Sequence, residues 1–377
     1  MLSTIASALV ERGHEVARID VPVPVAVERI YDLDVPRAVF ENSHEFFRYV
    51  AAREAFSEVD ASDMDVLISS QPPSFAIEHR RHLSIFYHHQ RLFYDLSELA
   101  VEAGLVHPDI HLVAQAAVRR LDQSCLDAVG MFLAPDVVID RLAQFNGIRD
   151  RANPFRAGSS LAERLLQIDA RELTFEMPLL VGRHEFPKRS ELFVHAMKFL
   201  PHTEGILVGS GGRLEWVKAL DRLLSQPGCD LEAFTASDLW LNKGIVDAPL
   251  PTVPNSNCRF LSGLSEDALV DLFRQALCVV ATPYQEDYGL TAVEAMAAGK
   301  PMIVCEDGGG LAHLVLDGIT GLIVEPTGPA IASAIDRFIR DPELARWMGV
   351  NARQLAERYS WDNGLRMFFD AFDIISS

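Results

Sequence analysis

Apolar residues recur along the chain in two alternating patterns. Apolar positions at helical spacing predict helices over residues 39–58, 111–129, 137–145, 161–170 and 191–199, and beyond Leu214. Short continuous apolar runs, typical of strands buried on both faces of a parallel sheet, occupy residues 65–69, 83–87, 130–134, 177–182, 205–208, 260–264 and 277–281. This alternation predicts an α/β fold with doubly wound sheets.

The first elements follow the same patterns. Residues 1–16 predict a helix that ends at Gly13, and a strand over residues 15–21 follows it. In the long helix over 111–129, we expect Arg119, Arg120 and Asp122 on the polar side.

The length of the chain favours two domains. Its 377 residues exceed what one hydrophobic core usually supports. The composition changes at residues 147–160, which are polar and contain Gly and Pro. We therefore expect a first domain over residues 1–155, a linker region over 156–176, a second domain over 177–360 and a final helix within 361–377.

The charge limits the kinds of partner to expect, and the cysteine content indicates the cellular compartment. The formal net charge of −19 disfavours nucleic acid as a partner, and an anionic membrane recognised through bulk charge. The five cysteines are scattered without metal spacing, which suits a reducing cytosol. No run of about eighteen apolar residues and no signal-peptide pattern occurs. We expect a cytoplasmic protein whose membrane contact is at most peripheral, at the inner membrane face.

The stretch over residues 281–301 carries the clearest candidate chemistry. An apolar strand leads into a loop with Glu286 and Asp287, then a glycine, then a helix that carries Glu294. Unpaired N–H groups near Leu290 and Thr291, in the first helical turn, can bind phosphate. The two glutamates can accept hydrogen bonds from hydroxyls. Together these features suit a sugar nucleotide.

These residues resemble the Glu-x7-Glu signature of retaining glycosyltransferases with the GT-B fold, family four, also called glycosyl transferases group 1. The likeness continues through residues 301–304, 308–311 and 317–324. It implies two Rossmann-like domains that face a cleft, with a C-terminal helix that crosses back to the first domain.

The resemblance implies a role for each matching residue. Glu294 binds the ribose hydroxyls of the donor, and Glu286 binds a hydroxyl of the donor sugar. His88 or His89, of which we favour His88, faces that sugar. The remaining donor-binding residues are two cations at the diphosphate, a glycine loop, and backbone N–H groups at the helix start: Arg183, Lys188, Gly209, Gly211, Asp287, Tyr288, Gly289, Leu290 and Thr291.

Two departures from the family pattern stand out. The first strand and its glycine-rich loop, which should precede the opening helix, are absent, so we expect the natural protein to carry about twenty or more residues before Met1. His313 stands where the family often has a glutamate.

The implied activity is transfer of a sugar, with retention of its anomeric configuration, from a nucleotide diphosphate-sugar such as a UDP- or GDP-sugar. The acceptor is a sugar, a lipid-linked molecule or a small molecule, in the glycosylation of cell-surface polysaccharide, glycolipid or secondary metabolites. No metal or other cofactor is implied, and we do not expect Asp32 and Asp34 to form a metal site. Two alternatives are a sugar-nucleotide epimerase of the same fold and a non-catalytic nucleotide-sugar-binding protein.

Overall fold

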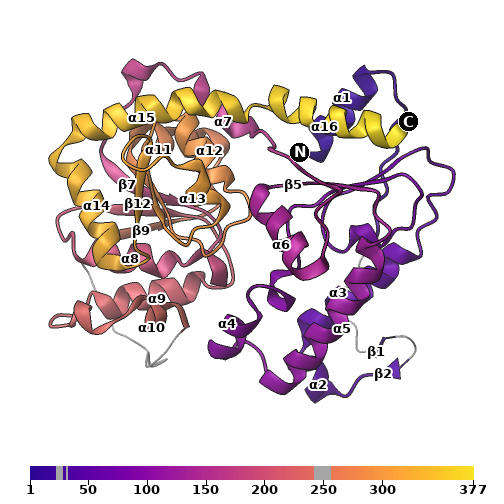
Figure 1. The fold of residues 1–377 in the computed structure, drawn as a ribbon. Coiled ribbons are helices and arrows are strands. Elements are labelled where there is room, and N and C mark those ends of the chain that lie inside the picture. The colour runs from indigo at the N-terminus through magenta and orange to yellow at the C-terminus, as the bar shows by residue number, and fades with distance from the viewer. Residues whose placement is uncertain (23–28, 31–32, 242–255) are drawn as a thin grey trace. The chain divides into compact units, whose positions relative to one another are not determined.

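The structure, a computed structural model, describes residues 1–22, 29–30, 33–241 and 256–377. The chain divides into two compact units (Figure 1). Unit 1 contains Met1–Ala157 and Asp362–Ser377, and unit 2 contains Gly158–Trp361.

Unit 2 is built on one parallel sheet of six strands in the order β12-β11-β10-β7-β8-β9. The strands are β7 (Met177–Val181), β8 (Gly205–Val208), β9 (Cys258–Leu261), β10 (Ala276–Ala281), β11 (Met302–Cys305) and β12 (Gly321–Val324). From β7 the chain winds outward to β9, then returns to β10 on the other side of β7. The strand order therefore reverses between β7 and β10, as in a doubly wound nucleotide-binding sheet.

Helices cover both faces of this sheet. They are α7 (Ser160–Leu166), α8 (Ser190–Lys198), α9 (Leu214–Leu224), α10 (Ala236–Leu241), α11 (Glu266–Gln275), α12 (Leu290–Ala297), α13 (Gly310–Leu314), α14 (Gly328–Arg340) and α15 (Pro342–Ala356). Successive residues of a strand point to opposite faces, so Leu179 and Val279 join one apolar core and Leu180 and Val280 join the other. Burial on both faces explains why these strands appear in the sequence as continuous apolar runs.

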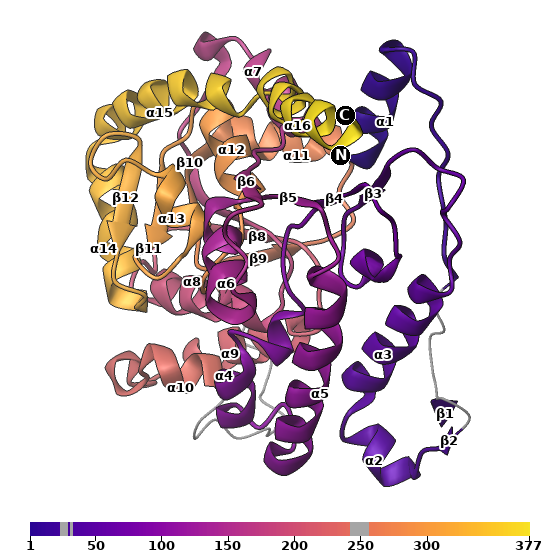
Figure 2. The same cartoon turned by 45° about the vertical axis from the view of Figure 1, so that its right-hand side comes forward.

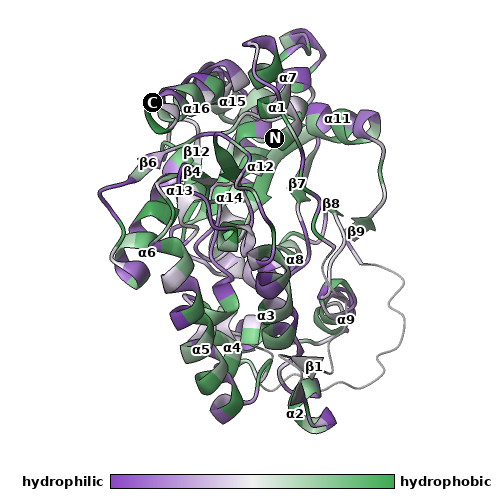
Figure 3. Ribbon diagram, turned by 90° about the vertical axis from the view of Figure 1, so that its right-hand side faces the viewer, coloured by the Kyte–Doolittle hydropathy of each residue, from purple (hydrophilic) through white to green (hydrophobic). Residues whose placement is uncertain are grey.

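Hydropathy along the helices reflects how deeply each is buried. In Figure 3, α12 is largely green along its length, whereas α11 carries both green and purple residues. Five of the eight residues of α12 are buried, but only Phe273 is buried in α11. α12 is thus an internal helix, and only its N-terminal end at Leu290 is well exposed.

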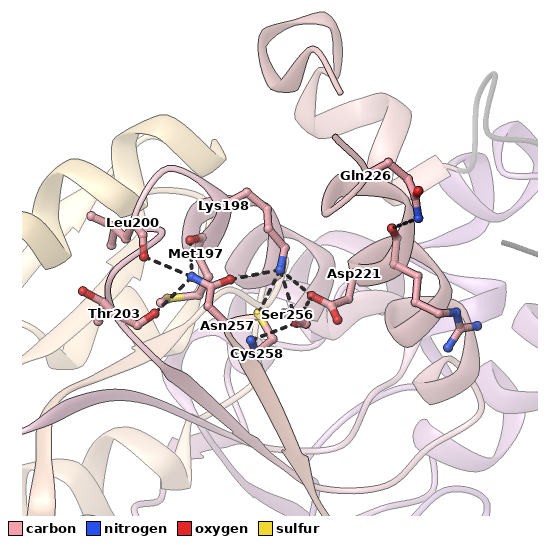
Figure 4. A network of polar contacts seen from close by, with 10 residues as sticks. Met197, Lys198, Leu200, Thr203, Asp221, Gln226, Ser256, Asn257 and Cys258 are labelled. Carbon is pink, nitrogen blue, oxygen red and sulfur yellow. Dashed lines mark hydrogen bonds and ion pairs between the residues drawn. The ribbon is translucent and has the colours of Figure 1, made fainter. Parts of the chain in front are cut away.

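A buried polar network fixes the start of the edge strand β9 (Figure 4). Lys198 Nζ donates to Asp221 Oδ1 at 2.5 Å and to Asn257 Oδ1 at 3.0 Å. Ser256 Oγ donates to the same carboxylate at 2.8 Å. The buried charge of Lys198 needs a partner of opposite charge, which Asp221 supplies. The network therefore ties α8 to α9 and to the start of β9.

Unit 1 has a parallel sheet of four strands in the order β3-β4-β5-β6. These are β3 (Leu67–Ser69), β4 (His82–Ile85), β5 (Met131–Ala134) and β6 (Ala152–Pro154), and a separate antiparallel pair joins β1 (Arg29–Ile30) to β2 (Leu33–Asp34). Its helices are α1 (Leu2–Glu11), α2 (Arg37–Glu41), α3 (His44–Ser57), α4 (Ser97–Glu102), α5 (Pro108–Leu126), α6 (Asp136–Asn146) and, from Asp362 on, α16 (Trp361–Ser376).

Helix α16 lies beside α1 within unit 1 (Figures 1 and 2). The guanidinium of Arg12 lies 3.4 Å from the centre of the Phe369 ring and 3.9 Å from the carboxylate of Asp373. The ring of Phe372 meets His14 edge-on. The first and last helices of the chain therefore pack together.

Four expectations for unit 1 are wrong. Residues 15–21 form no strand, because no described strand pairs with them, and all of them except Val21 are exposed. The helix over 39–58 breaks between α2 and α3, where the side chains of Asn42 and Ser43 bond to the carbonyls of Ala38 and Val39.

The other two concern the segment 147–160 and Asp122. The polar segment 147–160 contains β6, which pairs with β5. Asp122 is not on the polar side of α5, since it is 1% exposed and accepts hydrogen bonds from the hydroxyls of Tyr49 and Tyr94, each at 2.8 Å.

Candidate functional site

The candidate site lies at the carboxyl ends of β7 and β10, where the strand order of unit 2 reverses. In doubly wound sheets, ligands bind beyond the strand ends at this position. The loop after β7 carries Arg183 and Lys188, and the loop after β10 carries Glu286 and leads into α12. Residues about a hundred positions apart in the chain are therefore neighbours here.

Backbone hydrogen bonds hold the loop after β10 between its two neighbours. The N–H of Tyr284 donates to the carbonyl of Pro187 at 2.7 Å, on the β7 side. On the β11 side, the N–H of Glu286 donates to the carbonyl of Gly308 at 3.1 Å, and the N–H of Gly310 donates to the carbonyl of Glu286 at 2.7 Å. The backbone of Glu286 is thus fixed on both sides of its peptide unit.

The glycine run after β11 makes this contact possible. A Cβ atom on Gly309, whose φ is 61°, would lie 2.7 Å from the backbone nitrogen of Glu286. A Cβ atom on Gly310 would lie 2.7 Å from the carbonyl oxygen of Asp287. Only glycine allows the two loops to approach this closely.

Arg189 connects the same loops through its side chain, and the sequence reading missed it. Its buried guanidinium donates to the carbonyls of Thr282 and Pro283 at 2.8 and 3.1 Å, and to both carboxylate oxygens of Asp307 at 2.7 and 2.5 Å. Its backbone has φ 48°, a left-handed conformation that is uncommon outside glycine. A bidentate pair of this kind fixes geometry as well as charge.

Lys188 and Glu286 form an ion pair across the two strand-end loops. Lys188 Nζ lies 2.5 Å from Glu286 Oε2, and the side chains are 27% and 16% exposed. Arg183, on the same loop as Lys188, is exposed and forms no ion pair with another residue in the described part of unit 2. Of the three cations on this loop, Lys188 and Arg189 are each paired with a carboxylate of a described residue, and Arg183 is not.

Glu294 lies half-buried, about one turn into α12. Ser159 Oγ donates a hydrogen bond to Glu294 Oε1 at 3.0 Å. Burial raises the pKa of Glu294 to about 7, although the hydrogen bond from Ser159 lowers it. The sequence reading missed Ser159, because nothing in a local pattern links it to a residue far along the chain.

The N-terminus of α12 is shaped for an anion. Gly289 precedes it with φ 94°, and a Cβ atom there would lie 2.9 Å from Cβ of Leu311. The N–H groups of the first turn, including those of Leu290 and Thr291, have no partner within the helix, and the helix dipole favours negative charge at this end. Leu290 is 43% exposed, so the turn faces outward, whereas Tyr288 is buried.

The glycines after β8 hold that loop against the β7 loop. A Cβ atom on Gly209 would lie 1.8 Å from the carbonyl oxygen of Gly182, and one on Gly211 would lie 2.3 Å from that of His184. Both have φ near 150°, which side chains rarely adopt. Loop packing alone therefore requires glycine at both positions. The contact of Gly209 and Gly211 with a donor stays a prediction.

The histidines after β4 belong to unit 1. His89 is 2% exposed and its Nε2 lies 2.9 Å from Oδ1 of Asn146, while burial lowers its pKa to about 4. The ring of His88 is half-buried, with its Nδ1 2.7 Å from the carbonyl of His89. His89 is a core residue, so His88 is the one with access to solvent. His313, on α13 of unit 2, is exposed.

The segment that carries the candidate site matches a known protein family. Residues 253–355 match the model of the family described as Glycosyl transferases group 1, and this range contains Glu286, Glu294 and the glycine run. The part of the chain that carries the candidate site is therefore similar to this family. The chain is 37% identical over 288 residues to a D-inositol 3-phosphate glycosyltransferase of Streptomyces griseus subsp. griseus, which covers 72% of the chain and 55% of that protein.

A shorter match is with a protein from Dictyostelium discoideum. This alpha-1,3/1,6-mannosyltransferase is 38% identical over 95 residues, 25% of the chain and 22% of the relative. Across the first three curated relatives, the chain spans between 25% and 55% of their length. Their activities are therefore a basis for a proposal and not a finding about this chain.

Solved structures show that the chain has the GT-B fold. Sucrose-phosphate synthase from Thermosynechococcus elongatus is similar with a TM-score of 0.63 at 18% identity, over 99% of this chain and 92% of that one. HepE from Anabaena, solved with UDP and glucose, is similar with a TM-score of 0.55 at 15% identity, over 82% of this chain and 99% of that one.

The described residues also bear on membrane spans and metal sites. Within residues 1–22, 29–30, 33–241 and 256–377, no helix combines the length and the apolar character needed to cross a membrane. Those same residues contain no group of three or more His, Cys, Asp or Glu side chains placed to hold a metal ion. Asp32 lies outside the described residues.

Proposed function

We propose that this protein is a retaining glycosyltransferase that transfers a sugar from a nucleotide diphosphate-sugar to an acceptor. The observation that carries the proposal is the meeting of Lys188, Glu286 and the start of α12 at the strand ends where the sheet order reverses. Cations and a helix N-terminus suit a diphosphate, and partly buried carboxylates suit sugar hydroxyls.

The donor is a UDP- or GDP-sugar in this proposal. Glu294 accepts hydrogen bonds from the ribose hydroxyls, and Glu286 accepts one from the transferred sugar. The N–H groups from Asp287 to Leu290, and that of Thr291, line the phosphates and the sugar, with Gly209 and Gly211 beside them. The complex of HepE with UDP and glucose supports a uridine nucleotide as the first donor to test.

Bond breaking places negative charge on the leaving diphosphate, and Arg183 and Lys188 are the groups that stabilise it. Lys188 must first exchange Glu286 for a phosphate oxygen, which leaves Glu286 free to accept a sugar hydroxyl. The bond from the anomeric carbon to the phosphate oxygen breaks as the acceptor oxygen bonds to the same face. The acceptor's proton passes to the leaving phosphate, so no carboxylate nucleophile is needed.

Two protein cations and the dipole of α12 make a divalent metal unnecessary in this mechanism. His88 faces the donor sugar from unit 1. The acceptor is a sugar, a lipid-linked molecule or a small molecule, and the protein works in the cytoplasm or against the inner face of the membrane. Its net charge of −19 argues against a nucleic-acid partner.

A panel of UDP-, GDP- and ADP-sugars tests the proposal. A ligand that binds only the folded protein raises its melting temperature, so one nucleotide class should stabilise the protein while free sugars do not. The stabilising donor is then offered with candidate acceptors, and the product's anomeric configuration is determined by NMR. Stabilisation by no nucleotide sugar would overturn the proposal, and turnover of the donor without any acceptor would point to the epimerase class instead.

A further inference from the structure

Ser159 forms two hydrogen bonds at once at the start of α7. Its Oγ donates to Glu294 Oε1 at 3.0 Å and accepts from the backbone N–H of Ala162 at 3.4 Å. The second bond makes Ser159 the N-cap of α7. A hydroxyl has one proton to donate and two lone pairs, so both bonds are compatible, and the single proton is committed to the carboxylate of Glu294.

The surroundings of Glu294 give this bond its importance. Burial is the larger influence on its pKa, which it raises to about 7, and among the described residues the side chain that lowers it is Ser159. The elements packed against α12 are α7, α13, α15, β10 and β11. Their other titratable or charged groups, none of which contributes to this pKa, are Glu163, Arg164, Cys278, Cys305, His313, Glu343, Arg346 and Arg353.

Two of those cations form contacts with other groups. Arg164 pairs with Glu266 and Asp267, and Arg353 donates to the carbonyls of Leu166 and Ile168, both at 2.6 Å. A neutral hydroxyl is therefore the group that orients the Glu294 carboxylate.

We propose that Ser159 is a positioning residue for the nucleotide: by holding Oε1 of Glu294, its hydroxyl presents Oε2 to the ribose hydroxyls of the donor. This inference rests on the proposed function, in which Glu294 binds ribose. It assigns a role in donor binding to a residue near the start of unit 2, outside the Glu-x7-Glu signature.

The arrangement predicts a specific dependence on pH. The ionised carboxylate accepts hydrogen bonds from two hydroxyls, so nucleotide affinity should rise as pH increases through about 7, where Glu294 loses its proton. Without the Ser159 hydroxyl, the pKa of Glu294 rises further, and the midpoint of the affinity profile moves to higher pH. A residue that only capped α7 would change stability and leave this midpoint in place.

Variants can separate the two bonds of Ser159. Ser159→Gly removes the hydroxyl with little harm to the helix, because glycine is tolerated at an N-cap. Ser159→Thr keeps both bonds. Ser265→Gly is the matched control: Ser265 caps α11 by accepting from the N–H of Ala268 at 3.2 Å, with no bond to Glu294. Glu294→Gln has no ionisable group at this position, so any pH dependence that remains in its affinity comes from the nucleotide itself.

The experiment measures the Kd of UDP and of GDP by calorimetry between about pH 5.5 and about pH 8.5, a range that brackets the titration of the Glu294 carboxylate. We expect the parent, Ser159→Thr and Ser265→Gly to share one midpoint. Ser159→Gly should bind roughly 3- to 10-fold more weakly at neutral pH, the equivalent of one hydrogen bond, with a higher midpoint. Should Ser159→Gly fail to fold, Ser159→Asp keeps an acceptor for the N-cap but has no proton to donate to Glu294, and its comparison with Ser265→Asp tests the same bond.

The outcomes distinguish this inference from the function on which it rests. A Ser159→Gly profile that coincides with the parent's, while Glu294→Ala still weakens binding, overturns the role of Ser159 and leaves the proposed function standing. Equal nucleotide affinity in Glu294→Ala and the parent overturns the ribose assignment itself.

Discussion

Burial raises the pKa of two carboxylates, that of Glu294 in unit 2 to about 7 and that of Asp122 in unit 1 to about 6. Their surroundings differ. Each carboxylate oxygen of Asp122 accepts a hydrogen bond from a tyrosine hydroxyl, one from Tyr49 and one from Tyr94, and Asp122 is 1% exposed. Glu294 accepts one hydrogen bond from a described residue, and it follows the loop at the reversal of the sheet. A raised pKa thus marks burial, whereas unused hydrogen-bonding capacity at the strand ends marks a candidate binding site.

The largest effect should come from the cation at the strand ends. Lys188→Ala removes a charge that stabilises the leaving diphosphate, so we expect the transfer rate to fall by about 10²- to 10³-fold, or roughly 2.7–4 kcal/mol. Lys218→Ala is the control, because Lys218 pairs with Glu215 on the surface of α9. Single-turnover assays at saturating donor measure the effect, and equal rates for both variants would remove Lys188 from the mechanism.

Asp122→Ala should act on stability and not on the donor. Two buried tyrosine hydroxyls would lose their acceptor, which we expect to lower the free energy of unfolding of unit 1 by about 2–3 kcal/mol. Urea unfolding followed by fluorescence gives this value. The Kd for nucleotide should match the parent's under conditions where the variant is folded. A weakened Kd would show that unit 1's buried carboxylate does contribute to donor binding, and the contrast with Glu294 would fail.

Substitution of the two glutamates of the site should weaken the binding of different ligands. Glu294→Ala removes a charged acceptor for ribose and should weaken binding of the free nucleoside diphosphate by about 1.5–3 kcal/mol. Glu286→Ala should leave that affinity nearly unchanged and weaken binding or turnover of the intact sugar nucleotide. Calorimetry with both ligands tests this, with the exposed Glu343→Ala as the control. If both ligands weaken equally in either variant, the assigned roles are wrong.

The smallest expected effect is that of metal removal. Because Arg183, Lys188 and the start of α12 provide the positive charge in the proposed mechanism, activity should survive exhaustive treatment with EDTA within experimental error. Restoration of a lost rate by magnesium or manganese would falsify the metal-independent mechanism and direct attention to Asp32 and Asp34.

Local patterns in the sequence predicted the strands and the helix start of the candidate site. The run 277–281 lies in β10, and α12 begins at Leu290 and places Glu294 about one turn inside, as expected. Strands and helix starts depend on residues that are close together in the sequence, so the spacing of apolar positions predicts them.

Contacts between distant residues were beyond such patterns. Nothing near Arg189 reveals that its guanidinium reaches Asp307, and nothing near Ser159 reveals Glu294. Asp122 was assigned to a polar surface because a helical pattern cannot show that two tyrosines from other segments enclose it. The strand expected over 15–21 failed because a strand also needs a neighbour, which its own residues do not supply.

The position of β10 between β7 and β11 has a consequence for synthesis of the protein. The ribosome releases β7, β8 and β9 first, and these pair in that order with β7 at an open edge. That edge exposes unpaired N–H and C=O groups until residues 276–281 emerge and insert beside it. Unit 2 therefore completes its sheet late, so its nascent chain passes through a stage in which an apolar strand edge is available to a chaperone or to another chain.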